Sequence, residues 1–314
     1  MPIDVTTVET ASITLDEFVD RVSPLARRLS DEDTLASLAP SIIQLANNRT
    51  FLGDILLDFL TKTPINSDKH IGATFETYTS HVVMLRLDRK GKFIVRAAIW
   101  PSVKDYVYKV NGDKEFSFNY PHDHNFSFLT VGYFGPGYES DYYEIDPDSI
   151  LGVPGEATNL KFIERSRLYQ GKSLVYRAHR DVHVQYPPSG LSISLNLIGS
   201  GISTAMTDQY IFDVEKGTLK NAVSAGANSV LLDIAMKLGG DQSRHFVEEF
   251  ANKHPIDSIR YRASRALAGA NSKDQLEEFL QRASRDSSAY FRAMASSELA
   301  ATANLRAKLA ENRK

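Results

Sequence analysis

The chain has 314 residues, of which 42% are hydrophobic and 24% are charged, and its formal net charge at pH 7 is −3. This composition is typical of a globular protein with a packed core and excludes a disordered chain. The small negative charge provides no basic surface for nucleic acid or for an anionic membrane, so we expect neither partner. The sequence contains no cysteine, which leaves histidine and carboxylate side chains to hold any metal ion.

No stretch of the sequence has the roughly 18 uninterrupted apolar residues that a transmembrane helix needs. The N-terminal stretch MPIDVTTVETASITLDEF has neither a basic segment nor an apolar core, as a secretion signal would. We therefore expect a cytoplasmic protein.

Residues 1–70 are predicted to form an N-terminal helical segment. Thr14 stands three residues before Glu17, which is a capping-box pattern, and apolar residues then follow at helical spacing. The runs DEDTLASLAPSIIQLANN and TFLGDILLDFLTK continue this pattern, with Pro40 breaking or starting a helix.

Residues 71–220 change to short runs rich in Thr, Val, Ile, Tyr and Phe that alternate with period two, such as KFIVRAAIW, NFSFLTVGYF and LSISLNLIG. Turn signals such as Gly135-Pro136-Gly137 separate these runs. Many short strands at near-regular spacing predict an antiparallel sandwich or barrel.

Residues 221–314 are dominated by Ala, Leu, Arg and Glu and are predicted to be helical. The segments SIRYRASRALA and YFRAMASSELA superimpose at a period of 32 residues. This period is typical of HEAT-like helical pairs, so the tail is either a short helical stack or an ordinary helical bundle. Its expected role is contact with a second copy of the chain, a lid over the barrel, or contact with another protein, and the sequence does not choose among these.

Two histidines, His122 and His124, lie one residue apart at the start of an aromatic, β-branched run. Residues two apart in a strand point to the same face, so both imidazoles could bind one metal ion. A third histidine, His183, follows a glycine turn and a short strand further along the chain.

These two stretches resemble the two motifs of the cupin family, which has a double-stranded β-helix barrel with a central metal. The first stretch has the His-x-His pair and the spacing to Gly135, but Phe128 stands where the family has glutamate. Gly171 to His183 approximates the second motif, without its usual Pro-x-Gly. The resemblance implies an α+β chain whose cupin-like antiparallel barrel is flanked by N-terminal helices and a C-terminal helical region.

Loss of the glutamate resembles the cysteine dioxygenase branch of cupins, in which three histidines hold Fe(II). The segment RLDRKGKFIVRAAIW is similar to the part of those enzymes that binds the substrate carboxylate, and the similarity assigns that role to Arg86. The Ser-His-Tyr triad of that branch is not matched at Ser194-Leu195-Asn196, and the cysteine of its crosslink is absent. The resemblance therefore supports a three-histidine metal site better than a thiol substrate.

The resemblance implies that His122, His124 and His183 bind Fe(II), with Zn, Mn, Ni or Cu as alternative metals. Three neutral imidazoles leave three coordination positions open and leave the +2 charge uncompensated, which favours O2 and a small anionic, amino-acid-like substrate. We expect Tyr133 and Tyr176 to serve as phenolic hydrogen-bond donors, although a strand tyrosine is more often a half-buried packing residue.

Two other residues are candidates for supporting roles. His179 is either an alternative third ligand or a residue that orients His183. Glu139 could supply a carboxylate from a neighbouring strand, or it is a solvated charge.

Other readings of the same residues give different functions. His179 and Asp181 match the His-x-Asp motif of 2-oxoglutarate oxygenases. That family also needs a later histidine, and the later histidines of this chain fall in the helical tail. Cupin barrels also host non-catalytic ligand sensors, and Zn or Mn isomerases and hydrolases. The prediction is a metal-dependent oxygenase, and a metal-binding sensor or interaction protein is the main alternative.

Overall fold

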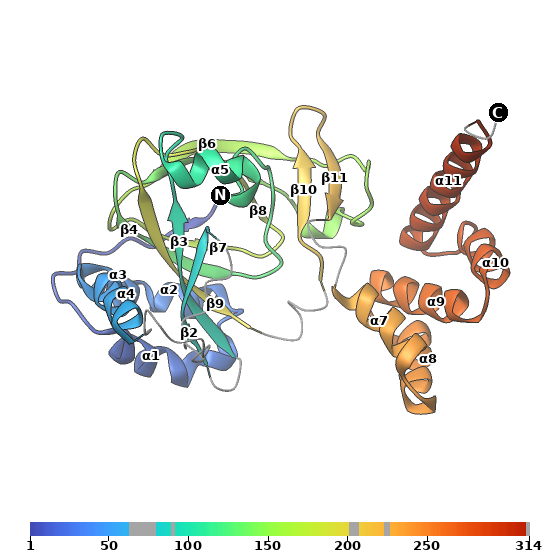
Figure 1. Cartoon of the computed structure of the whole chain (residues 1–314), viewed down its shortest axis with the longest axis horizontal. Helices are drawn as coiled ribbons and strands as arrows, with labels where there is room; N and C mark the ends of the chain where they lie inside the picture. The colour runs from blue at the N-terminus through green and yellow to red at the C-terminus, as the bar shows by residue number, and fades with distance from the viewer. Residues whose placement is uncertain (63–79, 89–91, 201–206, 223–226, 312–314) are drawn as a thin grey trace. The chain divides into compact units, whose positions relative to one another are not determined.

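A computed structural model describes the chain except for residues 63–79, 89–91, 201–206, 223–226 and 312–314 (Figure 1). The chain divides into two compact units. The first is made of Met1–Pro147 and Asn159–Thr204, and the second of Asp148–Thr158 and Ala205–Lys314. In the first unit the N-terminal helices share a hydrophobic core with the strands, and the last strand pair belongs to the second unit with the tail.

Helices follow one another from Leu15 to Lys62 in the N-terminal segment. The predicted capping box is present, since the Glu17 backbone N–H donates to Thr14 Oγ1 at 3.2 Å and the Thr14 N–H donates to the Glu17 carboxylate at 2.7 Å. The helices are α1 (Leu15–Val22), the 3-10 helix η1 (Ser23–Arg28), α2 (Glu32–Ser37), α3 (Ala39–Asn47) and α4 (Phe51–Lys62).

Two antiparallel sheets follow in the first unit. The six-stranded sheet has the order β1-β7-β4-β9-β3-β2 and the three-stranded sheet the order β6-β5-β8. The strands are β1 (Ile3–Asp4), β2 (Val82–Leu87), β3 (Phe93–Trp100), β4 (Phe128–Phe134), β5 (Tyr138–Glu144), β6 (Lys161–Leu168), β7 (Ser173–Tyr176), β8 (Asp181–Gln185) and β9 (Ser192–Gly199). A helix that the sequence did not predict, α5 (Tyr106–Glu115), precedes β4, and the short 3-10 helix η2 (Pro147–Ser149) follows β5.

The two faces of the six-stranded sheet pack against different neighbours. On β3, Val95 and Ala97 belong to the hydrophobic core that includes the N-terminal helices. Ala98 and Trp100 belong to a second core that also contains Tyr138 and other residues of the three-stranded sheet. The period-two pattern of the strand thus divides its side chains between a helical layer and the space between the sheets.

The predicted mixture of helices and antiparallel sheets is confirmed. In the part of the chain that the structure describes, the strands of the first unit form two facing sheets, and these do not join into a closed barrel. The arrangement is compatible with the predicted double-stranded β-helix.

The second unit contains a strand pair and the predicted helical tail. Its strands are β10 (Tyr210–Asp213) and β11 (Thr218–Ala222), and its helices are α7 (Ala227–Leu238), α8 (Asp241–Lys253), α9 (Asp257–Asn271), α10 (Lys273–Ala283) and α11 (Ala289–Glu311). Ala263 and Ala295, which the 32-residue period aligns, are both fully buried. A HEAT-like stack stays a prediction. Among the described residues, no helix is both long enough and apolar enough to cross a membrane.

Candidate metal centre

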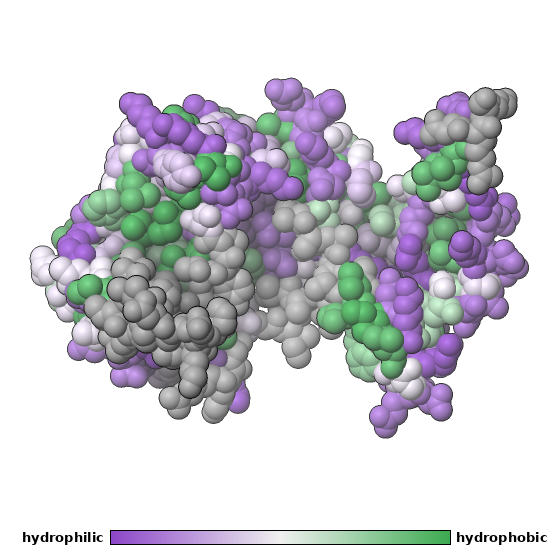
Figure 2. All heavy atoms as spheres, viewed as in Figure 1, coloured by the Kyte–Doolittle hydropathy of each residue, from purple (hydrophilic) through white to green (hydrophobic). Residues whose placement is uncertain are grey.

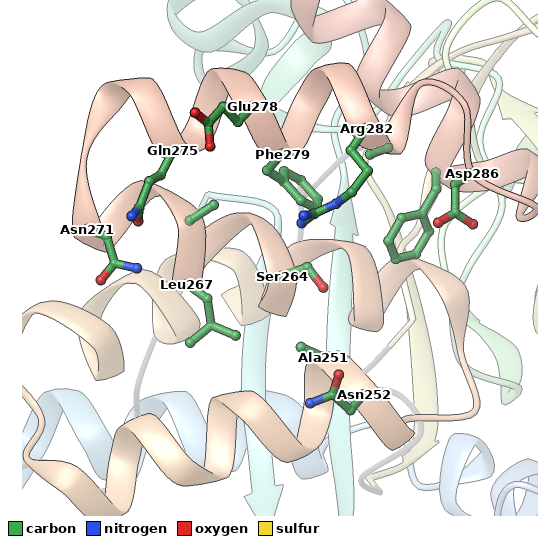
Figure 3. A pocket seen from close by; sticks show the side chains of 13 residues that line it. Ala251, Asn252, Ser264, Leu267, Asn271, Gln275, Glu278, Phe279, Arg282 and Asp286 are labelled. Carbon is green, nitrogen blue, oxygen red and sulfur yellow. The ribbon is translucent and has the colours of Figure 1, made fainter.

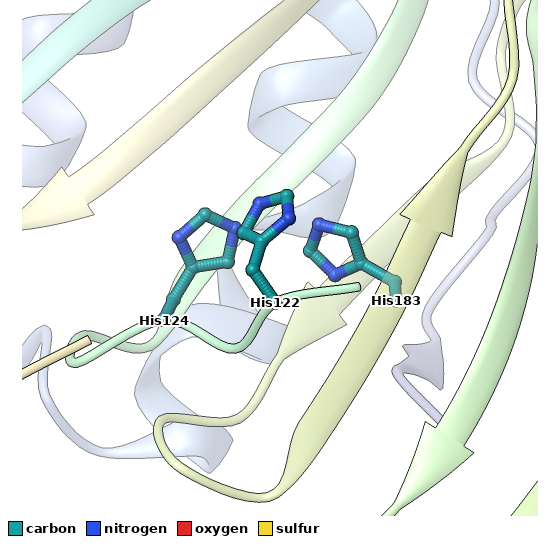
Figure 4. A group of neighbouring side chains, drawn as sticks. All are labelled: His122, His124 and His183. Carbon is teal, nitrogen blue, oxygen red and sulfur yellow. The ribbon is translucent and has the colours of Figure 1, made fainter. Parts of the chain in front are cut away.

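Three histidines from two separate stretches of the first unit converge (Figure 4). His122 and His124 lie in an irregular segment before β4, not in the strand that the sequence predicted, and His183 lies in β8. Each histidine offers one ring nitrogen to a group in which all such atoms lie within 4.8 Å of one another. This is a separation at which one ion could contact all three.

The backbone joins the two stretches. The His122 N–H donates to the His183 carbonyl at 3.1 Å, and the His183 N–H donates to the His122 carbonyl at 2.9 Å. This reciprocal pair forms an isolated antiparallel bridge. It fixes the distance between the two Cα atoms without a regular strand at His122.

The His122 ring is oriented by a backbone group. Its Nδ1 lies 2.8 Å from the Tyr120 carbonyl oxygen, which can only accept a hydrogen bond. The proton of a neutral imidazole is therefore held at Nδ1, and the lone pair stays at Nε2. A ring held in this tautomer is prepared to bind a metal ion through Nε2.

All three imidazoles are kept neutral by their surroundings. Burial lowers the pKa of His122, and it lowers the pKa of His124 and His183 well below the ordinary value, with the neighbouring histidines adding to the effect. Neutral imidazole is the form that binds metal ions. The residues therefore fit a cationic metal ion chemically.

Unpaired nitrogens give a second test of that fit. Within the described residues, both ring nitrogens of His183 and Nδ1 of His124 are buried without a hydrogen-bond partner. A buried polar atom without a partner is unfavourable and calls for an explanation. A metal ion bound by the three histidines would satisfy ring nitrogens that the protein leaves unpaired.

His179 contacts the same segment from outside the group. Its Nδ1 lies 3.3 Å from Asp123 Oδ2, and its backbone N–H donates to the His124 carbonyl at 2.8 Å. His179 adopts φ +57°, a left-handed conformation that is unfavourable for a residue with a side chain. Asp123 is buried between the two histidines, so this contact holds the His122–His124 segment in place.

The structure separates the two predicted tyrosines. The Tyr176 ring centroid lies 5.0 Å from that of His183, and its hydroxyl is 3.0 Å from the Tyr142 hydroxyl. Tyr133 belongs to the core on the opposite, helical face of the six-stranded sheet, where its hydroxyl donates to the Arg49 carbonyl at 2.7 Å. Only Tyr176 is brought to the histidines.

The structure also places Arg86 and Glu139 in contacts of their own. The Arg86 guanidinium pairs with Asp16 of α1 and is 41% exposed. Glu139 pairs with Arg167 of β6 at 2.9 Å, and both side chains are about half exposed. Neither contact involves a histidine of the trio.

Arg96 was missed by the sequence analysis. It lies on β3 between Val95 and Ala97, and its Nε is buried with no hydrogen-bond partner in the described part of the chain. Its charge also lowers the pKa of His124. The signal was present in KFIVRAAIW, where a single arginine interrupts an apolar run that alternates with period two.

A pocket of about 480 Å³ lies in the second unit between α8, α9 and α10 (Figure 3). Its lining is largely polar and includes Asn252, Ser264, Asn271, Gln275 and Arg282.

Over the residues that the structure describes, the histidine trio is the one group of His, Cys, Asp or Glu side chains placed to hold a metal ion.

Comparison with known proteins gives no family model and no curated protein that matches this chain. Several solved structures have similar parts. The DMSP lyase DddQ from Ruegeria pomeroyi is 10% identical, with 38% of this chain and 42% of that chain covered, at a TM-score of 0.21. A hydroquinone 1,2-dioxygenase in complex with Cd2+ is 12% identical, with 35% and 60% covered, at a TM-score of 0.22.

A cupin-like protein from Thermotoga maritima is 10% identical, with 49% of this chain and 88% of that chain covered, at a TM-score of 0.24. The chain spans less than half the length of the lyase that it matches. TM-scores this low do not establish a common fold, so the function of the histidine site depends on its own geometry.

Proposed function

We propose that the chain is a mononuclear Fe(II) oxygenase of the cupin class that acts on a small anionic, amino-acid-like molecule with O2. The observation that carries this proposal is the convergence of three neutral imidazoles, of which His124 and His183 have buried ring nitrogens without a partner among the described residues. His122, His124 and His183 would hold the ion. Fe(II) held by three histidines keeps coordination positions free for O2 and substrate and presents a positive charge to an anion.

Side chains around the trio have distinct roles in this proposal. Tyr176 would donate a hydrogen bond to the substrate, because its ring lies against His183 and burial keeps its phenol protonated by raising its pKa well above the ordinary value. His179 and Asp123 would hold the His122–His124 segment in the geometry that the ion requires. Arg86, Tyr133 and Glu139 contact other residues, so the roles that the sequence predicts for them stay predictions.

The test is elemental analysis of the purified protein by plasma mass spectrometry, followed by O2-uptake assays with amino acids and thiols. His122→Ala and His183→Ala are compared with His245→Ala, whose side chain is exposed on α8. We expect near-stoichiometric iron in the parent protein and in His245→Ala, and little in the two site variants. No metal in the parent after anaerobic Fe(II) loading would contradict the proposal.

The metal found decides between reaction classes. Zinc or manganese would favour an isomerase or hydrolase in which the ion acts as a Lewis acid, and nickel or copper would require a different assay.

A metal-binding protein without catalytic activity is the second candidate. It is favoured by the apolar surface of α7 (Figure 2), where the exposed side chains are Val230, Leu231, Ile234 and Leu238. Such a protein would retain metal and ligand without O2 uptake, and α7 substitutions would weaken its contact with a second copy or a partner protein. That contact and the cytoplasmic location stay predictions.

A further inference from the structure

Gln185 lies on the same face of β8 as His183, because the two residues are two positions apart in a strand that pairs regularly with β5. Their Cα atoms are therefore about 7 Å apart. In the register with β5, Gln185 stands opposite Ser140, and His183 stands opposite Tyr142, which belongs to the core between the sheets. Gln185 and Ser140 thus occupy the inward-facing position next to that of the candidate ligand His183.

The backbone holds Gln185 from two sides. On one side it pairs with Ser140 in the antiparallel ladder. On the other side its carbonyl accepts a hydrogen bond from the Asn119 N–H at 2.9 Å, next to an isolated parallel bridge with Phe118. The Gln185 side chain is 5% exposed, so it extends into the interior and not into solvent.

Two side-chain oxygens at this position are buried without a hydrogen-bond partner in the described part of the chain, Gln185 Oε1 and Ser140 Oγ. The Ser140 hydroxyl adjoins the Tyr142 phenol and lowers its pKa, but it forms no hydrogen bond with it. A buried oxygen that has lost water and gained no partner is unfavourable. The two oxygens therefore call for a group that completes their hydrogen bonds.

Other polar side chains that face the space between the sheets are paired. The Trp100 indole N–H donates to Ser194 Oγ at 3.0 Å, and the Thr130 hydroxyl donates to Asn196 Oδ1 at 2.7 Å. These residues alternate along their strands with residues of the helical core. The fold thus satisfies polar groups elsewhere in this space, which distinguishes the unpaired oxygens of β5 and β8.

The chemistry of the two oxygens selects the kind of ligand. A carboxamide oxygen only accepts hydrogen bonds, whereas a hydroxyl both donates and accepts. A carboxylate has no hydrogen to donate to Gln185. An ammonium group would be buried near a second ammonium group, because Lys172 donates to Ser166 Oγ at 2.7 Å and Ser166 stands opposite Ser140 on β6. A neutral group that both donates and accepts matches the two oxygens.

We propose that Gln185 and Ser140 bind a neutral hydrogen-bonding group, a primary amide or a hydroxyl, at the end of the substrate distal from the metal ion. The inference rests on the proposed function and narrows its substrate to an anion that carries such a group. Gln185 is then a residue that determines specificity, and the histidines bind the ion.

The test is titration calorimetry on the protein loaded with Zn2+, because zinc does not activate O2 and the probes are not consumed. Succinamate is compared with 4-oxopentanoate, which has the same shape but a methyl group in place of the amide NH2. The hydroxyl probe is 4-hydroxybutanoate. We expect the parent to bind succinamate or 4-hydroxybutanoate about 10-fold more tightly than 4-oxopentanoate, because these probes satisfy a buried acceptor. The tighter of the two identifies the neutral group.

Substitution assigns the preference to its residues. Gln185→Met removes the acceptor at similar volume, so it should abolish the preference and retain the parent's zinc content and its affinity for 4-oxopentanoate. Ser140→Ala should lose part of the preference. Gln281→Met, at an exposed glutamine of α10, should behave as the parent.

A zinc-loaded parent that binds the three probes equally, or binds none of them, would overturn the proposal, as would a Gln185→Met variant that keeps the preference. Melting temperatures separate binding from folding. Because Gln185 Oε1 is unpaired, ligand-free Gln185→Met should melt at or above the temperature of the parent. A fall of several degrees would show that the carboxamide serves the fold, which would also overturn the proposal.

Zinc content is measured on the same samples. A parent that holds no metal would contradict the proposed function, and Gln185 is then tested in metal-free protein with propanamide against butanone, which lack the anionic end. A preference for propanamide that Gln185→Met abolishes would leave the role of Gln185 intact, and no preference would overturn it.

Discussion

His122 and His183 exchange two backbone hydrogen bonds, at 3.1 and 2.9 Å, although 60 residues separate them in the chain. This pairing places the two imidazoles side by side, with ring centroids 4.4 Å apart. The side chains of the trio are therefore positioned by the main chain, and exchanging one side chain should leave the backbone bridge in place.

The first prediction concerns the relative roles of His183 and His179. His183→Ala should reduce metal affinity far more than His179→Ala, because His183 is a member of the trio and His179 contacts Asp123 instead. For His179→Ala we expect a loss of about 10- to 100-fold, as is usual for residues that orient a ligand. Competition with a metallochromic chelator measures both. Equal losses would contradict the ligand assignment.

The second prediction concerns the Tyr176 hydroxyl. Tyr176→Phe and Tyr142→Phe each remove the same buried hydroxyl contact, so each should lower the free energy of unfolding by about 1 kcal/mol. O2 uptake by the iron-loaded enzyme should fall further in Tyr176→Phe, because the Tyr176 ring lies against His183 and stacks on Phe128. Equal activity losses would show that the contact between the two tyrosines matters, rather than the Tyr176 phenol.

The third prediction concerns acid stability. Arg165 donates two hydrogen bonds to the Asp141 carboxylate and Tyr186 donates a third, and these bonds lower the pKa of Asp141, with Arg165 as the main cause. Because the folded-state pKa is lowered, this stabilisation is complete above the unfolded pKa of about 4 and is lost as the pH falls through the folded value. Asp141→Asn should lower the free energy of unfolding by about 1 kcal/mol near pH 7, since Arg165 is half exposed.

Urea unfolding at pH 7 and at pH 3 measures this difference, which should shrink at the lower pH. Glu139→Gln is the matched control, because its pair with Arg167 joins the same two strands but is more exposed. A difference between Asp141→Asn and the parent that did not depend on pH would rule out this explanation.

The fourth prediction concerns close packing at β4. A methyl group on Gly132 would lie 2.1 Å from the Tyr169 carbonyl oxygen, a backbone atom that cannot turn away. Gly132→Ala should therefore lower the free energy of unfolding by about 1–3 kcal/mol. Gly53→Ala should have the opposite sign, because Gly53 is exposed within α4 and has open space around it. Chemical denaturation of both variants tests the contrast.

Local patterns predicted the secondary structure well. The capping box at Thr14 and Glu17 and the period-two strands depend on residues a few positions apart, and all of these features are present. The grouping of His122, His124 and His183 also followed from the sequence, but the argument used strand geometry that the His122–His124 segment does not have. Instead of a strand, an isolated bridge between His122 and the distant His183 holds this segment. Local sequence patterns do not reveal such a bridge.

Whether Tyr133 and Tyr176 lie near the histidines depends on which face of the sheet each side chain occupies. Tyr133 and Tyr176 both lie in aromatic strands, yet they point to opposite sides of one sheet. Tyr133 keeps the period-two alternation of Leu129 and Val131, and all three lie in the core with the helices. Alternation groups these side chains on one face, but the sequence of β4 alone could not tell which face meets the histidines, because the histidines lie outside β4.

Side chains on the two faces of β3 have different neighbours, so substitutions on the two faces should have different effects. Substitutions at Phe93, Val95 or Ala97 must conserve the volume that the helices pack against. Changes at Ile94, Arg96 or Ala98 fall on the other face and leave that packing untouched, but Ala98 is itself buried in the core between the sheets. A mutant library confined to Ile94 and Arg96 could therefore vary the face between the sheets while most of its members still fold.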